Sequence, residues 1–118
     1  KGYLEYGPGL FNVYKSSDIF ILPSYTEGFP HSIWEAAANC CPIITTSVGG
    51  IPAILENNFD CVFIKPYDEN EIVNSVQNLL LKDSLRKKII SNAYRKAKEY
   101  SIEYCIERLL LEINNEPK

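Results

Sequence analysis

The chain has 118 residues, of which 46% are hydrophobic and 23% are charged. This length suits a single domain with a proper core, and the apolar content excludes intrinsic disorder. The net charge of −3 argues against bulk nucleic-acid binding, and no apolar run approaches the ~20 residues of a membrane-spanning helix.

Three short apolar runs in the first two thirds of the chain are typical of buried strands. They cover residues 18–23, 42–46 and 61–64, and none alternates between apolar and polar residues. Strands that are apolar on both faces indicate a parallel sheet covered on both sides. A weak strand over residues 2–5 and a short helix over residues 9–16 are expected before the first run.

Helical patterns separate and follow these runs. Apolar residues at three-and-four spacing predict helices over residues 31–39, 51–57, 70–81, 83–98 and 102–113. Strands that alternate with helices imply right-handed βαβ units. We therefore expect an α/β fold, a three-layer Rossmann-like parallel sheet followed by two C-terminal helices. The expected domain covers residues 1–113, and the polar tail 114–118 is expected to fray.

The four cysteines do not predict a metal site or a disulfide framework. No C-x-x-C spacing occurs, the only histidine is His31, and Cys40 and Cys41 are adjacent. A zinc site needs ligand pairs at short fixed spacings. We expect free, mostly buried thiols in a reducing cytosol, with neither a metal nor a cofactor.

Positive charge gathers in one predicted helix. Seven of the twelve Lys and Arg residues fall between Lys82 and Lys98, whereas the first 81 residues hold three lysines against nine carboxylates. Such a helix could bind anionic lipid or a polyanionic partner. The favoured interpretation is the solvated face of an amphipathic helix, because an apolar residue recurs every four positions at Leu85, Ile89, Ala93 and Ala97.

The loop after the first apolar run carries the most distinctive residues. In open parallel sheets, ligands bind beyond the carboxyl ends of the strands. Glu27 lies in that loop, Gly28 permits a tight turn, and Pro30 suits a first helical position. The amides of His31 and Ser32 would then be unpaired at a helix N-terminus, which is a ready anion site.

Two carboxylates flank this expected anion site. Glu35 lies about one turn further into the helix, opposite the core-facing Ile33 and Ala37, so it can point along the cleft. A diphosphate could lie on the amides while Glu27 and Glu35 accept hydrogen bonds from hydroxyls, an arrangement that matches a nucleotide sugar. In the alternative interpretation both glutamates are simply solvated, and His31 is a polar surface residue rather than a general base.

Two stretches of sequence together indicate a protein family more specifically than the glutamate pair does. Residues 18–38 read DIFILPSYTEGFPHSIWEAAA, and residues 42–52 read PIITTSVGGIP. With the KPYD of residues 65–68, they resemble the C-terminal domain of retaining glycosyltransferases of the GT-B fold, in the glycosyl transferases group 1 family. The hallmark of that family is an E-x7-E motif, here Glu27 and Glu35. The similarity covers nearly the whole chain.

This resemblance implies that the domain binds a nucleotide-sugar donor, with Glu35 on the ribose hydroxyls. The other donor contacts that it implies are Glu27, Gly28 and Phe29 to the transferred sugar, and the amides of His31 and Ser32 to the diphosphate. It implies transfer of a hexose from a UDP-sugar or GDP-sugar to a hydroxyl with retention and without a bound metal. The product would be a polysaccharide, a lipid-linked oligosaccharide or a glycolipid.

The resemblance also implies that the chain is part of a longer enzyme. The family's C-terminal domain begins earlier, with an Arg/Lys pair that grips the phosphates, and its N-terminal domain binds the acceptor. The sequence contains no methionine, not even at residue 1. We therefore expect a partial donor-binding domain that is inactive alone, from a cytoplasmic enzyme. Its glycan or lipid-linked acceptor would bind the missing N-terminal domain, and peripheral contact with the inner face of the membrane stays open.

Two departures from the family pattern concern glycines. The family usually has Gly where Cys40 and Cys61 stand. A residue with a Cβ atom in a left-handed helix end costs roughly 1–2 kcal/mol. Asn39 could take that conformation in place of Cys40.

Two other functions remain as alternatives. The first is a non-catalytic binding or assembly module of the same fold, which would act through the cationic helix at residues 82–98. Salt-sensitive binding to anionic vesicles that ignores Glu27 and Glu35 would favour it. The second is a related GT-B enzyme, such as a sugar-nucleotide epimerase or a phosphorylase.

Overall fold

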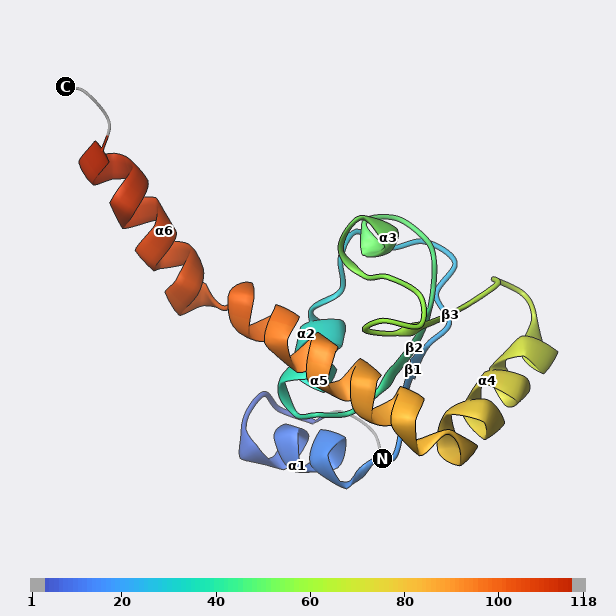
Figure 1. The fold of residues 1–118 in the computed structure, drawn as a ribbon. Coiled ribbons are helices and arrows are strands. Elements are labelled where there is room, and N and C mark those ends of the chain that lie inside the picture. The colour runs from blue at the N-terminus through green and yellow to red at the C-terminus, as the bar shows by residue number, and fades with distance from the viewer. Residues whose placement is uncertain (1–3, 116–118) are drawn as a thin grey trace.

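The computed structural model describes residues 4–115 of the chain. Figure 1 shows the elements found there, which are α1 (Pro8–Ser16), β1 (Phe20–Leu22), α2 (His31–Ala38), β2 (Ile43–Thr46), α3 (Ile51–Ile54), β3 (Val62–Ile64), α4 (Glu69–Leu81), α5 (Asp83–Glu99) and α6 (Ile102–Asn115). Helices alternate with strands up to α4, and two further helices follow. The predicted element order is confirmed.

The three strands form one parallel sheet in the order β1-β2-β3. Ile44 of β2 pairs with Ile21 of β1 on one side and with Val62 of β3 on the other. All four residues of β2 are buried, as expected for a central strand that is apolar on both faces. The predicted parallel sheet is therefore confirmed.

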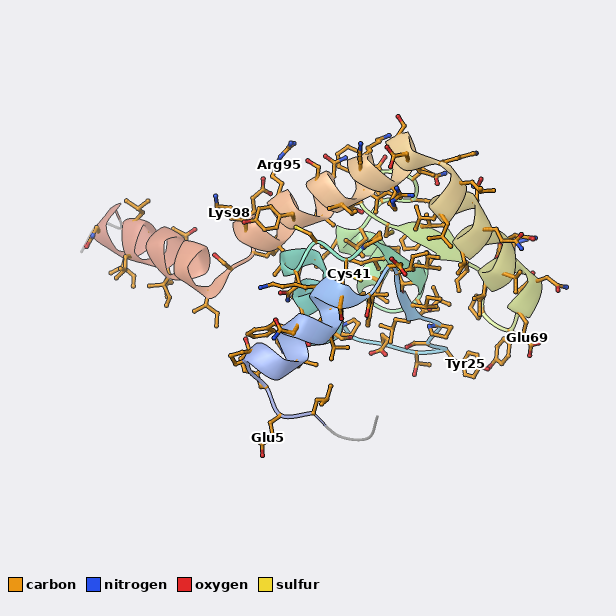
Figure 2. All side chains as sticks on the ribbon, turned by 90° about the horizontal axis from the view of Figure 1, so that it is seen from below. Glu5, Tyr25, Cys41, Glu69, Arg95 and Lys98 are labelled. Carbon is orange, nitrogen blue, oxygen red and sulfur yellow. The ribbon has the colours of Figure 1, made fainter. Side chains whose placement is uncertain are left out.

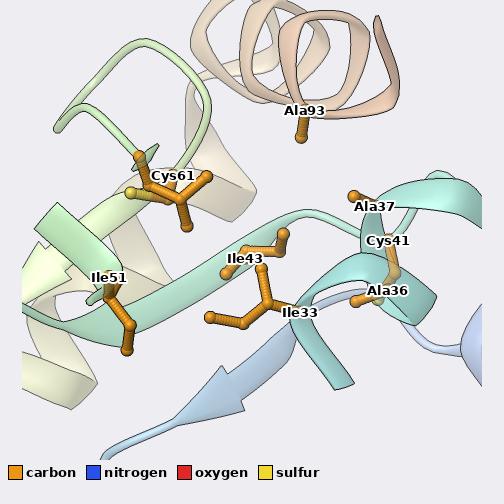
Figure 3. Close-up of a cluster of buried hydrophobic side chains, with 9 residues drawn as sticks. Ile33, Ala36, Ala37, Cys41, Ile43, Ile51, Cys61 and Ala93 are labelled. Carbon is orange, nitrogen blue, oxygen red and sulfur yellow. The ribbon is translucent and has the colours of Figure 1, made fainter. Parts of the chain in front are cut away.

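Two apolar clusters hold helices against opposite faces of the sheet. The first joins Ile33 of α2 to Ile43 of β2 and includes Ala93 of α5 (Figure 3). The second joins Ile44 of β2 to Leu79 of α4. Successive residues of a strand point to opposite faces, which is why Ile43 and Ile44 enter different clusters. The predicted three-layer arrangement is confirmed.

Helix α5 contributes to both clusters through one apolar stripe. Ile89 and Ala93 are buried, and Leu85 and Ala97 pack against the clusters beside them. The stripe predicted from four-residue spacing is therefore confirmed. Basic side chains lie on the remaining surface of the helix, where Arg95 and Lys98 extend outward (Figure 2).

Several basic residues of α5 interact with the protein itself. Arg86 donates to the carbonyl of Leu80 at 3.0 Å and forms an ion pair with Asp83. Lys87 forms a second ion pair with Asp83 at 2.9 Å. These contacts favour the interpretation of α5 as a solvated amphipathic helix over that of a cationic binding face.

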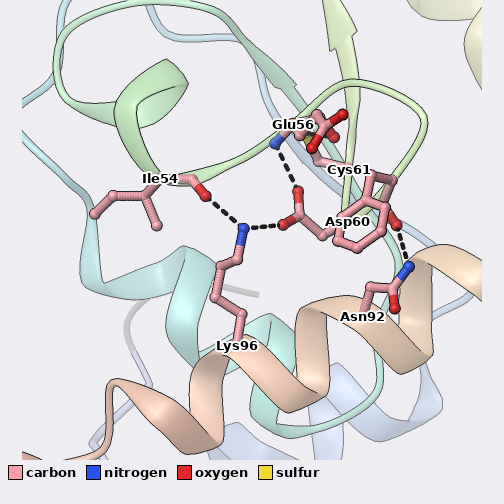
Figure 4. A network of polar contacts seen from close by, with 7 residues as sticks. Ile54, Glu56, Asp60, Cys61, Asn92 and Lys96 are labelled. Carbon is pink, nitrogen blue, oxygen red and sulfur yellow. Dashed lines mark hydrogen bonds and ion pairs between the residues drawn. The ribbon is translucent and has the colours of Figure 1, made fainter.

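A polar cluster attaches the segment 54–60, which connects α3 to β3, to helix α5 (Figure 4). Asp60 is fully buried, accepts from the amide of Glu56 at 2.8 Å and forms an ion pair with Lys96. The same Lys96 ammonium donates to the carbonyl of Ile54 at 2.6 Å. A buried carboxylate requires such partners, so this segment depends on α5 for its position.

Two predicted elements differ from the structure. Helix α3 was expected to reach Asn57 but ends at Ile54, because Leu55 is extended with ψ 150° and Asn57 bridges to Cys61. The weak strand expected over residues 2–5 is not seen at residues 4 and 5. Its other residues lie outside the described part of the chain.

Cys40, Cys41 and Cys61 are free thiols, and the last two are buried. The expectation of free, mostly buried cysteines is confirmed for these three, and the Cys105 side chain lies outside the described residues. The expectation that Asn39 adopts the left-handed conformation after α2 is wrong. Asn39 has φ −99°, whereas Cys40 has φ 57° because the chain turns one residue later.

Helix α6 extends away from the rest of the molecule, in the views of both Figure 1 and Figure 2. The molecule measures 57 × 29 × 29 Å. The helix runs two residues beyond its predicted end, and residues 116–118 of the predicted tail lie outside the described residues. Within residues 4–115, no helix combines the length and the apolar character that crossing a bilayer requires.

Candidate functional site

The loop between β1 and α2 holds Glu27 in a defined orientation. Glu27 Oε1 accepts from Ser24 Oγ at 2.7 Å, and the carbonyl of Ser24 accepts from the Thr46 hydroxyl at 2.6 Å. Thr46 is fully buried at the end of β2. The Glu27 carboxylate is half-buried and is linked through Ser24 to the central strand of the sheet.

Two glycines after β2 allow this loop to approach the sheet closely. Gly49 has φ +57°, and a Cβ atom there would lie 1.5 Å from the carbonyl oxygen of Glu27. The amide of Gly50 donates to the carbonyl of Gly28 at 2.8 Å, and a Cβ at Gly50 would lie 2.9 Å from that oxygen. No larger residue fits at Gly49 without moving the loop, so the Gly-Gly turn sets the position of Glu27.

Helix α1 orients the second carboxylate. Glu35 Oε2 accepts from the Tyr14 hydroxyl at 2.8 Å, and the Tyr14 ring packs against Phe20 with ring centroids 5.7 Å apart. Burial raises the pKa of Tyr14, and the hydrogen bond to Glu35 raises it further. The hydroxyl therefore stays protonated and remains a donor to Glu35.

Helix α2 begins at His31, so Pro30 precedes the helix as its N-cap residue instead of occupying the first helical position. Pro30 has φ −75° and ψ 133°, and no described side chain caps this end. Its carbonyl accepts from the amide of Ile33 at 3.2 Å. The amides of His31 and Ser32 have no partner within a helix that starts here, and the positive end of the helix dipole lies beside them.

Phe29 belongs to a row of aromatic rings beside this helix start. The centroids of Phe29 and Trp34 are 4.8 Å apart, and Trp34 stacks on Tyr100 at 5.2 Å. Phe29 also packs against the first apolar cluster. The ring is thereby fixed at the end of the loop, next to Gly28.

The six residues singled out from the sequence follow one another along a single loop and the first turns of α2. Tyr14, Ser24 and the steric role of Gly49 are not among the residues predicted from the sequence. Ser24 lies three residues before Glu27, a spacing that could have revealed it, whereas nothing local connects Tyr14 with Glu35. Among the residues that the structure describes, no group of three or more His, Cys, Asp or Glu side chains is arranged to hold a metal ion.

Comparison with known proteins identifies a family for most of the chain. Residues 3–96 match the family described as glycosyl transferases group 1. A Campylobacter jejuni N,N'-diacetylbacillosaminyl-diphospho-undecaprenol alpha-1,3-N-acetylgalactosaminyltransferase is 30% identical over 92% of this chain and 29% of its own length. An Escherichia coli UDP-Gal:alpha-D-GlcNAc-diphosphoundecaprenol alpha-1,3-galactosyltransferase is 35% identical over 55% of this chain and 17% of its own. The chain thus spans less than a third of these relatives.

Solved structures agree with this match. The C-terminal domain of the group 1 glycosyl transferase LpcC from Francisella tularensis superposes with a TM-score of 0.76 at 27% identity, covering 86% of this chain and 53% of that one. Anabaena HepE, solved in complex with UDP, gives a TM-score of 0.76 at 20% identity over 86% of this chain and 28% of its own. At that identity the HepE comparison concerns the fold alone.

Proposed function

Because the chain belongs to the glycosyl transferases group 1 family, we propose that it binds a nucleotide-sugar donor at the loop after β1 and the start of α2. The proposal rests mainly on one observation. Glu27 and Glu35 lie before and after the first amides of α2, and each carboxylate is held by a hydroxyl donor, Ser24 or Tyr14. Carboxylates fixed in this way can accept further hydrogen bonds from a ligand without first being ordered.

Each part of the donor has a matching group in this site. The diphosphate lies on the amides of His31 and Ser32, where the helix dipole favours negative charge. The ribose hydroxyls donate to Glu35, and the hydroxyls of the transferred sugar donate to Glu27 beside Gly28. Hydrogen bonds to a charged carboxylate contribute roughly 1.5–3 kcal/mol each.

In the whole protein, this site serves transfer of a hexose with retention at the anomeric carbon. The bond between that carbon and the diphosphate oxygen breaks, a bond to the acceptor hydroxyl oxygen forms, and the proton of that hydroxyl is released to water. The nucleoside diphosphate leaves with additional negative charge. The N-terminus of α2 stabilises that charge without a metal ion.

The names of two relatives support a class of acceptor and of donor. Both relatives are named for transfer to a sugar carried on diphospho-undecaprenol, and the Escherichia coli enzyme is named for a UDP-galactose donor. We extend this chemistry to the whole protein, with a UDP-sugar as donor and a lipid-linked saccharide as acceptor. Such an acceptor would bring the protein to the cytoplasmic face of a membrane as a peripheral protein.

Titration of the ¹⁵N-labelled chain with UDP-glucose and with GDP-mannose, followed by NMR, tests this proposal. We expect weak binding with shifts concentrated on residues 27–35, because carboxylates and helix amides alone must hold the ligand. Glu35→Ala should abolish the shifts. The matched control is Glu99→Ala, which removes an exposed carboxylate at the end of α5 and should leave them unchanged.

Two outcomes would contradict the proposal. One is the absence of shifts at residues 27–35 with both nucleotide sugars. The other is a set of shifts on the basic residues of α5 that persists in Glu35→Ala and weakens with salt. The second result would favour a polyanion-binding module of the same fold.

A further inference from the structure

Two exposed tyrosines form a stacked pair beside the candidate site. Tyr25 follows β1 and Tyr67 follows β3, two strands that are not neighbours in the sheet. Their ring centroids are 4.1 Å apart and their planes differ by 12°. Tyr25 is 58% exposed and Tyr67 is 80% exposed, so the ring faces that do not stack on each other are accessible to solvent at the carboxyl ends of the strands.

The backbone of Tyr67 is in a conformation that tyrosine disfavours. Tyr67 has φ 64°, in the left-handed region that glycine adopts without steric conflict. Because the Tyr67 ring is so exposed, its burial contributes little free energy to offset this backbone cost. Burial therefore gives no reason for tyrosine at this position, and such outliers concentrate at functional sites.

A pocket of about 240 Å³ adjoins the two rings and carries polar groups. Its lining includes Lys65, Asp68 and Glu69 together with the tyrosines; Figure 2 shows Tyr25 and Glu69 at the same end of the molecule. Asp68 Oδ1 accepts from the amide of Glu71 at 3.0 Å as the N-cap of α4, which fixes its side chain. Charged donors and acceptors thus lie at the edge of an aromatic surface.

We propose that Tyr25 and Tyr67 form a platform for a pyranose ring, separate from the donor residues 27–35. A pyranose has an apolar face of C–H bonds that packs on an aromatic ring, and its rim of hydroxyls requires donors and acceptors. Lys65 supplies the donor, and Asp68 supplies an acceptor. A nucleobase would also stack on the rings. It has fewer hydrogen-bonding groups than a pyranose, however, to contact the three charged side chains of the pocket.

The platform adjoins the candidate donor site through one short segment. Tyr25 directly follows Ser24, whose hydroxyl donates to Glu27. A sugar on the platform therefore lies next to the loop proposed to hold the transferred hexose. Binding of a pyranose at the platform does not depend on the proposed donor site.

Tyr67→Gly is the decisive variant, because glycine accepts the same backbone angle and removes only the ring. We would titrate the 118-residue chain with chitotriose and record ¹³C-aromatic and ¹⁵N NMR spectra. The expected result is shifts at Tyr25, Tyr67 and Lys65, with binding weakened about fivefold or more in Tyr67→Gly and in Tyr25→Ala. Tyr94→Ala removes another exposed tyrosine, on α5, and should bind like the unmodified chain.

The outcomes of this experiment test the pyranose platform independently of the proposed donor site. Chitotriose shifts at the platform support it even if UDP-glucose fails to bind at residues 27–35. The proposal is overturned if chitotriose causes no shifts at the tyrosines, or if uridine shifts them and chitotriose does not.

Discussion

Cys40 follows the end of helix α2 with φ 57°, in the left-handed region that glycine adopts most readily. A side chain with a Cβ atom in this conformation costs roughly 1–2 kcal/mol. Cys61 lies outside the left-handed region and is fully buried. Glycine at these two positions is therefore expected to have opposite consequences for the fold.

We expect Cys40→Gly to raise the free energy of unfolding by up to about 1 kcal/mol, since relief of the strain is partly offset by the greater freedom of glycine in the unfolded chain. Urea denaturation measures this change. Cys61→Gly is the matched control and should lower the free energy of unfolding, because it leaves a cavity in the core. A lower stability of Cys40→Gly would contradict the account of the helix end.

The hydrogen bond between Tyr14 and Glu35 makes a prediction about pH. In the folded chain the pKa of Tyr14 lies above its ordinary value of 10.0, first through burial and then through Glu35. The stability that this raised pKa contributes is complete below pH 10.0 and is lost as the pH rises above it, because the unfolded tyrosine then ionises. We expect the free energy of unfolding to fall above this pH more steeply for the unmodified chain than for Tyr14→Phe.

Urea denaturation from neutral pH to about pH 11 checks this expectation, with Tyr14→Phe less stable by about 1 kcal/mol at neutral pH. Burial also raises the pKa of Cys41 to about 11, but that contribution is common to both proteins. If the free energy of unfolding fell equally with pH in the unmodified chain and in Tyr14→Phe, the result would contradict the view that Tyr14 holds Glu35 through a protonated hydroxyl.

At the scale of elements, the helices other than α3 could be predicted from the sequence to within about two residues at each end. Helix α5 begins and ends within one residue of its predicted bounds, since its buried stripe recurs over four turns. Helix α3 ends three residues early because the fold draws Asn57 into a bridge with Cys61. That contact is tertiary, and the local pattern of residues 51–57 carries no sign of it.

Helix α5 also fixes the segment before β3 through Lys96. Removing this ammonium leaves the Asp60 carboxylate buried without its partner, and breaking a buried pair in this way costs about 3–5 kcal/mol. We expect Lys96→Ala to lower the free energy of unfolding by that amount in urea denaturation. Lys98→Ala, an exposed lysine on the same helix, should leave it unchanged, and equal effects of the two variants would contradict the role of Lys96.

At the scale of the whole molecule, alternation of apolar runs and helices was enough to predict the parallel three-layer fold. It also placed Glu27 in the loop after β1 and Glu35 on the following helix. What the sequence could not reveal are the contacts between distant elements, such as Tyr14 with Glu35 or Tyr25 with Tyr67. These pairs form only when strands and helices are already packed, so no local spacing encodes them.

Helix α6 contributes little to that packing. Its described apolar side chains are exposed, namely Ile102, Ile106, Leu109, Leu110, Leu111 and Ile113. None of them belongs to either apolar cluster. Elements before α6 therefore form the two apolar clusters that stabilise the part of the chain that positions the candidate site.

The most direct test of the donor site is the orientation of a bound nucleotide sugar, measured by intermolecular NOEs between UDP-glucose and the isotope-labelled chain. We predict NOEs from the ribose protons to residues of α2 around Glu35, and from the glucose protons to Glu27, Gly28 and Phe29. Ribose and glucose protons that contact α5, with none near α2, would contradict the assignment of this site.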